Sequence, residues 1–248
     1  MVLKLSGINF GYNRKRWVFS DFSLTITERA TVLLGPNGAG KSTFMALAAT
    51  HHRPRQGRIT WRDIAPDRRS GRARYVRAVA WLPQNIVAIP GLTVREQVAY
   101  SGWLKGMSRR AAWDASSDAL ARTQLAALGD RKSHQLSGGQ MRRMGIAGAL
   151  THHSELILLD EPTAGLDPTQ RGVFRDLLER LSADVHVLVS THQTEDLADS
   201  YTQVVVLDHG AVRFQGAPEA FYALAGNHGA LPRERAEAAY AQVVRQDV

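Results

Sequence analysis

The sequence contains no cysteine and no long apolar run. Without cysteine there is no disulfide framework, no thiol nucleophile and no thiolate metal site. No segment reaches about 18 consecutive apolar residues, and the first residues lack the basic start and apolar run of a secretion signal. Sustained heptads and internal repeats are missing as well. We therefore expect a chain suited to a reducing compartment that does not cross a membrane by itself.

The length and composition that are present are typical of one large α/β domain. The 248 residues are 44% apolar and 22% charged, which indicates a folded chain with a substantial core. The net charge is +8, and arginines gather in residues 58–77. Such a segment fits nucleic acid, anionic lipid or an acidic partner, although a solvated basic face is the commoner explanation. We expect the main domain at 1–225, with a helical insertion at about 90–140, and a helical tail at 226–248.

Short apolar, β-prone runs fall into two groups along the chain. Turn-forming residues separate the runs near the N-terminus, at 2–5, 22–26 and 31–34. Three later runs are uninterrupted rather than alternating, which is typical of buried strands covered by helices on both faces; they lie at 156–160, 185–190 and 204–208. The turn residues Asp208, His209 and Gly210 predict a hairpin between the last strands.

Capping residues mark the expected helices. KSTFMALAA follows a glycine-rich loop, and Thr93 with Glu96 forms a capping-box pattern. The capping box opens an expected helical insertion, because residues 93–128 contain no convincing strand. LDPTQRGVFRDLLERL predicts another capped helix, and PEAFYAL begins a terminal helical region. Residues 226–229 are expected to break the chain before a packed terminal helix.

The segment GPNGAGKST has the spacing G-x-x-x-x-G-K-[ST] and predicts a phosphate-binding loop. Glycines permit a loop whose backbone N–H groups turn inward, and the helix that follows presents its positive end to phosphates. Lys41 adds a full charge at the β and γ phosphates, and the Ser42 hydroxyl can ligate magnesium. The candidate nucleotide-binding residues of the loop are Gly35, Pro36, Asn37, Gly38, Ala39, Gly40, Lys41, Ser42 and Thr43.

An acidic pair in LILLDEP supplies the second half of such a site. Asp160, at the end of an expected buried strand, can hold a magnesium shell, and Glu161 is placed to orient and activate an attacking water. No N-K-x-D sequence that would read guanine is present, which argues against a GTPase. These two elements alone leave a small-molecule kinase open.

A second candidate anion site lies at LSGGQMRR, residues 136–143. Ser137, Gly138 and Gly139 leave backbone N–H groups exposed at an expected helix start. A serine N-cap alone would explain Ser137. It would not explain two glycines, which lower helix stability unless something approaches closely.

Taken together, these motifs resemble the nucleotide-binding subunit of an ATP-binding cassette (ABC) transporter. The matching elements occur in the family's order from residue 35 to 192, and an aromatic FGY at 10–12 extends the match toward the N-terminus. They are GPNGAGKST, Gln84 in WLPQ, LSGGQ, LILLDEP, GLD at 165–167 and His192 in VSTH. The resemblance implies a P-loop NTPase core with a mainly parallel sheet flanked by helices, an N-terminal antiparallel β-subdomain and an inserted α-helical subdomain.

The resemblance also implies a role for each matching residue. Glu161 is the general base, Gln84 contacts magnesium and the attacking water, and His192 contacts the γ-phosphate. Tyr12 stacks on adenine, with Trp17 as a rival, and Asp167 communicates between two sites. The implied catalytic residues are Glu161, His192, Lys41 and Gln84, the magnesium ligands are Ser42, Gln84 and Asp160, and the nucleotide contacts outside the loop are Tyr12, Ser137, Gly138, Gly139, Gln140 and Asp167.

As ligands and partners, the resemblance implies ATP, Mg²⁺, a second ATPase subunit and a separate integral membrane permease. The second subunit is the same chain or a close relative, and its signature would meet the ATP held by this chain's loop. The location implied is the cytoplasmic face of a membrane. The helical insertion is similar to that of exporter subunits, which favours export over import. The rival hypothesis, an ABC ATPase acting on nucleic acid or the ribosome, is disfavoured because such proteins usually join two cassettes or carry coiled coils.

Two details depart from or lie outside this pattern. The helix after the signature reads MRRMGIAGAL, where many relatives carry an arginine near position 148. Gly145 and Gly148 should each lower helix stability by about 1 kcal/mol relative to alanine. The histidines other than His192, including the pairs at 51–52 and 152–153, are expected at the surface.

Overall fold

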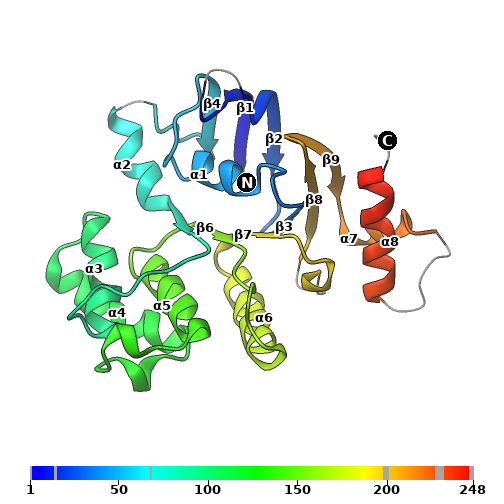
Figure 1. Ribbon diagram of the computed structural model, residues 1–248. Helices are drawn as coiled ribbons and strands as arrows, with labels where there is room; N and C mark the ends of the chain where they lie inside the picture. Colours follow the sequence, from blue (N-terminus) through cyan, green and yellow to red (C-terminus); the bar gives the residue numbers. More distant parts are fainter. Residues whose placement is uncertain (1, 14–15, 68, 198–200, 227–231, 246–248) are drawn as a thin grey trace.

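The computed structural model describes residues 2–13, 16–67, 69–197, 201–226 and 232–245 of the chain. Its elements form a central sheet, a smaller antiparallel sheet above it and a group of helices to one side (Figure 1). None of the helices in the described ranges combines the length and the apolar character that crossing a membrane requires.

The central sheet has six strands in the order β5-β6-β7-β3-β8-β9. The first five are parallel, and β9 pairs antiparallel with β8 through the predicted hairpin, which is confirmed. β6 and β8 are buried along their whole length, as their uninterrupted apolar runs predicted, and β3 is fully buried as well. The strands are β3 (Ala30–Leu34), β5 (Val79–Leu82), β6 (Leu156–Asp160), β7 (His186–Thr191), β8 (Gln203–Asp208) and β9 (Ala211–Gly216).

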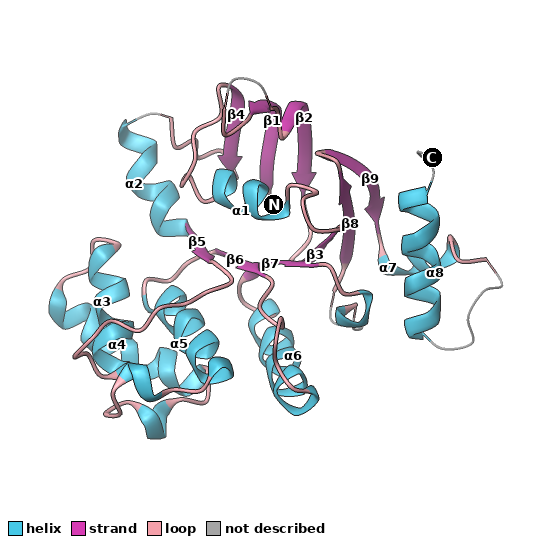
Figure 2. Ribbon diagram, viewed as in Figure 1, coloured by secondary structure: helices cyan, strands magenta, loops and turns pink. Residues whose placement is uncertain are grey.

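The smaller sheet is antiparallel and carries β1 between its two neighbours, in the order β2-β1-β4. Helix α1 (Lys41–Ala48) lies between this sheet and the central one (Figure 2). Alternating burial along β2 directs one side chain in two toward α1, where Phe22 meets Phe44. The strands are β1 (Leu3–Phe10), β2 (Phe19–Ile26) and β4 (Gln56–Trp61).

Successive residues of the central strands enter two different hydrophobic cores. In β3, Val32 and Leu34 belong to the core that also contains α5, α6 and α8, whereas Leu33 belongs to the core shared with α1 and the smaller sheet. The carboxyl ends of the parallel strands are thereby fixed from both faces. The helices of the first core are α5 (Gly138–Thr151), α6 (Pro168–Ser182), α7 (Pro218–Ala223) and α8 (Pro232–Arg245).

Three helices form the insertion beside the sheet: α3 (Val94–Leu104), α4 (Arg109–Arg122) and α5. The predicted capping box is confirmed, because the Thr93 hydroxyl accepts from the Glu96 N–H and the Glu96 carboxylate accepts from the Thr93 N–H. Short 3₁₀ turns at Ala126–Leu128 and Ser133–Gln135 join α4 to α5.

The two unexpected glycines of α5 lie where other segments approach the helix closely. A Cβ atom at Gly145 would lie 2.5 Å from Ile86 Cδ1, and one at Gly148 would lie 2.8 Å from the Ser101 hydroxyl. Both distances are below any ordinary contact, so close packing against the loop after β5 and against α3 offsets the loss of intrinsic helix stability.

The arginine-rich segment 58–77 divides between β4 and helix α2 (Arg69–Ala78), neither of which the sequence analysis identified. The predicted break at 226–229 is described only at Gly226, because residues 227–231 lie outside the described ranges. In the tail, α8 buries Ala236 and Ala239, and Tyr240, Val243 and Val244 pack against the same core.

The expectation that all histidines other than His192 lie at the surface is wrong for His152. This residue ends α5 and is 4% exposed, and its Nδ1 lies 3.1 Å from the Arg77 carbonyl oxygen. Burial, with a smaller effect of the Lys105 charge, lowers the pKa of His152 to about 4. His152 is therefore a neutral core residue at physiological pH, whereas its neighbour His153 is exposed as expected.

Candidate active site

The phosphate-binding loop between β3 and α1 needs glycine at three positions for two reasons. Gly38 and Gly40 have φ values of 86° and 106°, in the left-handed region that other residues rarely adopt. A Cβ atom at Gly35 would lie 2.2 Å from the Leu207 carbonyl oxygen, so only glycine allows the loop to pass β8. The β8–β9 turn holds the loop from the same side, because the Gly210 N–H donates to the Ala39 carbonyl at 3.0 Å.

Lys41 is the first residue of α1, and its ammonium group lies inside the loop. Its Nζ donates to the carbonyl oxygens of Gly35 at 2.7 Å and Pro36 at 3.1 Å. The side chain is 5% exposed, and Nζ lies 3.7 Å from Glu161 Oε1. Burial lowers the pKa of Lys41, and the nearby carboxylates of Glu161 and Asp160 oppose that shift. The site thus holds a largely desolvated cation where a phosphate would lie.

The acidic pair ends β6, and a serine on the neighbouring strand fixes both members. The Ser190 hydroxyl donates to Asp160 Oδ1 at 2.6 Å and accepts from the Glu161 N–H at 3.0 Å. Glu161 has a φ of 47°, an uncommon value for a residue with a side chain. Ser190 therefore orients the buried Asp160 and helps hold Glu161 in a strained conformation.

The Glu161 carboxylate is the point at which the predicted catalytic residues meet. Its Oε1 lies 3.1 Å from His192 Nδ1 and 3.7 Å from Lys41 Nζ, and its Oε2 accepts from Gln84 Nε2 at 3.5 Å. Gln84 follows β5, Glu161 follows β6 and His192 follows β7, so the three come from the carboxyl ends of adjacent parallel strands. The structure brings together all four residues to which the sequence analysis assigned catalysis.

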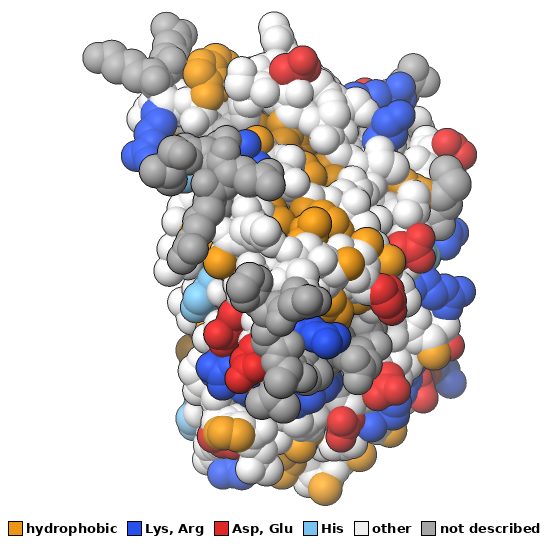
Figure 3. Space-filling view, turned by 90° about the vertical axis from the view of Figure 1, so that its right-hand side faces the viewer, with side chains coloured by type: hydrophobic (Ala, Val, Ile, Leu, Met, Phe, Trp, Pro, Cys, Tyr) orange, Lys and Arg blue, Asp and Glu red, His pale blue; other side chains and the backbone are white. Residues whose placement is uncertain are grey.

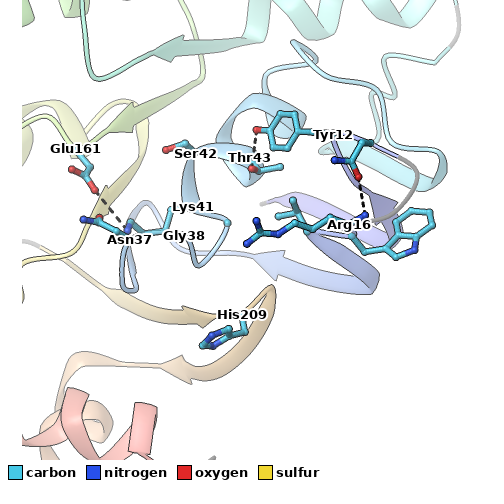
Figure 4. Close-up of a pocket in the computed structure, with 13 residues that line it drawn as sticks. Tyr12, Arg16, Asn37, Gly38, Lys41, Ser42, Thr43, Glu161 and His209 are labelled. Carbon is cyan, nitrogen blue, oxygen red and sulfur yellow. Dashed lines mark hydrogen bonds and ion pairs between the residues drawn. The ribbon is translucent and has the colours of Figure 1, made fainter.

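A cavity of about 640 Å³ opens beside this cluster, large enough for a small-molecule ligand. Figure 4 shows Lys41, Ser42 and Thr43 on its α1 side and Glu161 across from them. His209, at the β8–β9 turn, lines it from below in that view. The lining residues are Tyr12, Asn13, Arg16, Trp17, Val18, Asn37, Gly38, Gly40, Lys41, Ser42, Thr43, Glu161 and His209.

Two exposed aromatic side chains stand at the end of the cavity away from Glu161. Tyr12 is 65% exposed, and its hydroxyl lies 3.0 Å from Thr43 Oγ1. Trp17 is 48% exposed, with the Arg55 guanidinium 4.7 Å from its ring centre. Both rings line the cavity, and contact of either ring with an adenine base stays a prediction.

The predicted magnesium ligands present a donor set suited to that ion. The hydroxyl of Ser42 is exposed in the cavity, Asp160 supplies a carboxylate, and Gln84 supplies an amide at the surface. Among the described residues, no group of three or more His, Cys, Asp or Glu side chains could hold a metal. Mg²⁺ commonly binds through one or two carboxylates and completes its shell with water and substrate phosphates. The residues present therefore fit magnesium and do not form a closed protein cage.

The signature residues 137–140 do not line this cavity. Ser137 caps α5 through a capping box with Gln140, since each side chain accepts from the other residue's N–H. A Cβ atom at Gly139 would lie 2.6 Å from Gln170 Oε1, but one at Gly138 would meet no atom within 4 Å. The Gln170 side chain thus packs closely against Gly139, whereas Gly138 faces open space.

Asp167 is also outside the cavity and begins a different helix. Its side chain caps α6 by accepting from the Gln170 N–H at 2.9 Å. The sequence analysis missed Ser190 and the cavity-lining His209. Serine at the end of a strand and histidine in a turn carry no sequence signal of their own.

The chain matches one family model and is similar to curated proteins and to solved structures. A family model described as "ABC transporter" matches residues 19–164. The sulfate/thiosulfate import ATP-binding protein CysA of Synechococcus elongatus is 35% identical over 207 residues, which cover 82% of this chain and 59% of that protein. The cobalt import ATP-binding protein CbiO of Rhodobacter capsulatus is 34% identical over 223 residues, which cover 88% of this chain and 80% of that protein.

A solved dimeric structure of a bacterial ABC transporter cassette is similar with a TM-score of 0.75 and 26% identity, over 87% of this chain and 98% of that one. The chain thus spans about three fifths of CysA and most of CbiO. The matched segment contains the phosphate-binding loop, Gln84, the signature and the acidic pair. The fold, the site and these relatives agree that the chain belongs to the ABC transporter family.

Proposed function

We propose that the chain is the ATP-hydrolysing subunit of an ABC transporter and works as a dimer with two ATP molecules between its subunits. The observation that carries the proposal is the meeting of Lys41, Gln84 and His192 at the Glu161 carboxylate, beside a cavity that two aromatic rings line. Tyr12 or Trp17 holds the adenine, and the loop from Gly35 to Thr43 holds the phosphates.

In this proposal Glu161 takes the proton of the attacking water. Lys41 offsets the negative charge of the β and γ phosphates, and His192 contacts the γ-phosphate from the side of β7. Ser42, Asp160 and Gln84 would hold Mg²⁺, which when bound offsets further phosphate charge. Ser190 keeps the Asp160 carboxylate oriented toward that position and limits the freedom of Glu161.

The signature serves the ATP of the other subunit. Ser137, Gly138, Gly139 and Gln140 do not line their own cavity, and the space above Gly138 would admit a phosphate of a bound nucleotide. Asp167, which caps α6 at the same exposed side, communicates between the two sites. The dimeric relative supports this arrangement.

A separate membrane-spanning partner would convert the dimer cycle into transport. The helical insertion exposes a mainly apolar groove of about 380 Å³, in which Tyr100, Trp103 and Trp113 are each about two fifths exposed. We propose that this groove receives the partner at the cytoplasmic face of a membrane. The aromatic side chains would supply most of the contact area.

For the direction of transport we propose import. The two curated relatives described above are named import ATP-binding proteins. They favour the importer alternative over the export that the helical insertion suggested from sequence. The residues that select a transported molecule would lie in the membrane partner.

The decisive experiment uses Glu161→Gln with ATP. We expect ATP hydrolysis to fall by about 10²–10⁴-fold, because the general base is lost. ATP binding should remain, so light scattering after size-exclusion chromatography should report a dimer with ATP and a monomer without it. Glu179→Gln, an exposed change on α6, is the matched control. A Glu161→Gln protein that stays monomeric with saturating ATP would contradict the shared-site arrangement.

The membrane partner is tested separately. Tagged Glu161→Gln with ATP should recover a multi-span membrane protein from detergent-solubilised native membranes, identified by mass. Trp103→Glu should lose that protein while it keeps ATP-dependent dimerisation. Recovery of ribosomes or nucleic acid in place of a membrane protein would keep the ATPase assignment and overturn its transport role.

A further inference from the structure

The segment after His192 is fastened to two helices by a single acidic side chain. His192 follows β7 directly, and the short 3₁₀ turn Thr194–Asp196 comes next. Within that turn, Glu195 Oε2 lies 3.7 Å from Arg171 Nη1 on α6, and Glu195 Oε1 pairs with Arg233 Nη2 on α8. We call Glu195, Arg171 and Arg233 together the Glu195 bridge.

On the α6 side, the bridge reaches the segment of Asp167. Arg171 Nε donates to the Leu166 carbonyl at 3.1 Å, so one guanidinium contacts both the residue before Asp167 and the turn after His192. Arg171 is also on the first turn of the helix that Asp167 caps. The bridge is therefore a direct physical link between the segments of Asp167 and His192.

On the α8 side, the bridge reaches the C-terminal part of the chain. Arg233 lies in the first turn of α8, and the Tyr222 hydroxyl donates to the Leu197 carbonyl at 3.2 Å just past the turn. α8 packs beside β8, β9 and the turn at the edge of the molecule (Figure 1). Figure 3 shows acidic and basic side chains interspersed on this face, as pairing rather than a field of one sign requires.

His192 itself has few constraints on its own. Its side chain is 36% exposed, and its Nδ1 lies 3.1 Å from the Glu161 carboxylate. The backbone before it is fixed by the pairing of β7 with β6 and β3. The backbone after it is fixed by the Glu195 bridge and by Tyr222. The bridge thus holds the backbone on the C-terminal side of His192, and the pairing of β7 holds it on the N-terminal side.

We propose that Glu195 is a positioning residue for His192, held by Arg171 from the Asp167 segment and by Arg233 from the C-terminal helix. The inference rests on the proposed ATPase function, because it gives His192 its γ-phosphate role. It assigns α8 a part in the rate of hydrolysis, through Arg233 and Glu195 and without contact with ATP.

Enzyme kinetics on four variants test the proposal. Glu195→Gln and Arg233→Gln should each lower kcat by about three- to tenfold, less than the ~100-fold that follows a 1 Å misplacement of a reacting group. KM for ATP should stay within about twofold, because Tyr12, Trp17 and the phosphate-binding loop, which hold the ATP in the proposed function, are untouched. The double variant should be no slower than Glu195→Gln, since that change already removes the pairing with Arg233 along with the pairing with Arg171. Arg233→Lys should recover part of the rate.

Glu237→Gln is the matched control. Arg233 Nε also pairs with Glu237 Oε1 at 3.0 Å within α8, so this change removes a carboxylate from the same arginine and leaves Glu195 in place. It should hydrolyse ATP at the wild-type rate. Unchanged kcat in Glu195→Gln, multiplying effects in the double variant, or an equal loss in Glu237→Gln would each overturn the proposal.

The NMR signal of the His192 ring tests this inference separately from the proposed function, because it is measured without ATP hydrolysis. In protein labelled with ¹⁵N-histidine and free of nucleotide, Glu195→Gln and Arg233→Gln should shift the ring signal of His192, assigned by its loss in His192→Ala. If wild-type protein hydrolyses no ATP, the proposed function fails while the ring signal still tests the bridge. If hydrolysis is normal and neither kcat nor the ring signal responds, the bridge alone is refuted.

Discussion

Glycines mark the starts of both α1 and α5, yet the two starts are built in opposite ways. At α1, two left-handed glycines wrap the loop around the Lys41 ammonium, and the loop borders a cavity. At α5, Ser137 caps its own helix, and Gly138 faces open space. Under the proposed function, the first start binds ATP within one chain, whereas the second leaves room at Gly138 for the nucleotide of another chain. The same local feature would then be a complete site in one place and half of a site in the other.

The sharpest test of this contrast is Gly138→Glu. The new side chain has room, so the fold should survive, but its carboxylate would repel a phosphate brought by a second subunit. We expect ATP hydrolysis to fall by about 10²–10³-fold, as for loss of one anion-stabilising donor, with ATP binding to the monomer unchanged. Gly172→Glu, at a second open glycine on α6, is the control and should be active.

Mixing subunits extends that test. Lys41→Ala and Gly138→Glu should each be inactive alone, but a mixed dimer keeps one site in which an intact loop faces an intact signature. ATP hydrolysis should therefore reappear when the two proteins are mixed. If the sites act independently, each mixed dimer should hydrolyse ATP at up to about half the rate of a wild-type dimer. If mass measurement shows mixed dimers but ATP hydrolysis does not recover, the signature does not act on the ATP of the other subunit, and the contrast between a complete and a half site is wrong.

The next effect concerns the complete site by itself. Lys41→Ala removes a buried cation that would form charge-assisted hydrogen bonds, so ATP affinity of the monomer should fall by about 10- to 100-fold. Lys132→Ala, at an exposed lysine of the helical insertion, should bind ATP normally in the same titration. If Gly138→Glu weakened monomer binding as much as Lys41→Ala, the signature would belong to its own chain's site.

A smaller change distinguishes the two aromatic rings at the cavity. Tyr12→Ala should weaken ATP binding by about 1–3 kcal/mol, the range for stacking on a nucleic-acid base, while Tyr12→Phe should keep most of the affinity. Calorimetry of both variants and of Trp17→Ala measures this directly. A larger loss in Trp17→Ala than in Tyr12→Ala would move the adenine to the tryptophan.

The smallest effect lies at the opposite end of α5, where His152 is buried and neutral. Its pKa of about 4 is below the unfolded value of 6.5, so the unfolded chain takes up the proton first as the pH falls. The stability contributed by the neutral ring is complete above pH 6.5 and declines between pH 6.5 and 4. Between pH 8 and 5.5 we expect a loss of about 1 kcal/mol in the free energy of unfolding.

Denaturant unfolding of His152→Gln at both pH values measures that loss. The variant should lose stability overall but should lack the part of the pH dependence due to His152. His153→Asn is the matched control, because His153 is exposed and asparagine tolerates its φ of 55°. An unchanged pH dependence in His152→Gln would show that the ring is not the titrating group.

Much of the fold was predictable because its signals are local. Uninterrupted apolar runs located β6, β7 and β8, and the capping box located α3. β4 escaped because Ile59 and Trp61 are its only apolar residues, and an alternation this short is a weak strand signal inside the arginine-rich segment. The sequence around the two glycines of α5 could not explain them, because Ile86 and Ser101, which pack against them, lie far away in the sequence.

The site residues that belong to sequence motifs were predictable. Those that come together only through the pairing of neighbouring strands were not. The loop, the acidic pair and the signature each carry their own pattern. Ser190 does not, and its role depends on the pairing of Asp160 with Ser190 between β6 and β7. Strand order cannot be read from one sequence, so a partner defined by a neighbouring strand stays hidden until the sheet is known.

The meeting of three loops at one carboxylate has a consequence for timing. Glu161 contacts a lysine from the phosphate-binding loop, a glutamine from the side of the helical insertion and a histidine tied to the C-terminal helix. Under the proposed function, a water molecule at Glu161 is aligned only when all three loops are in place at once. Hydrolysis would then require nucleotide, partner and neighbouring subunit to be bound at the same time. Any one of them alone would leave the water unaligned and the ATP intact.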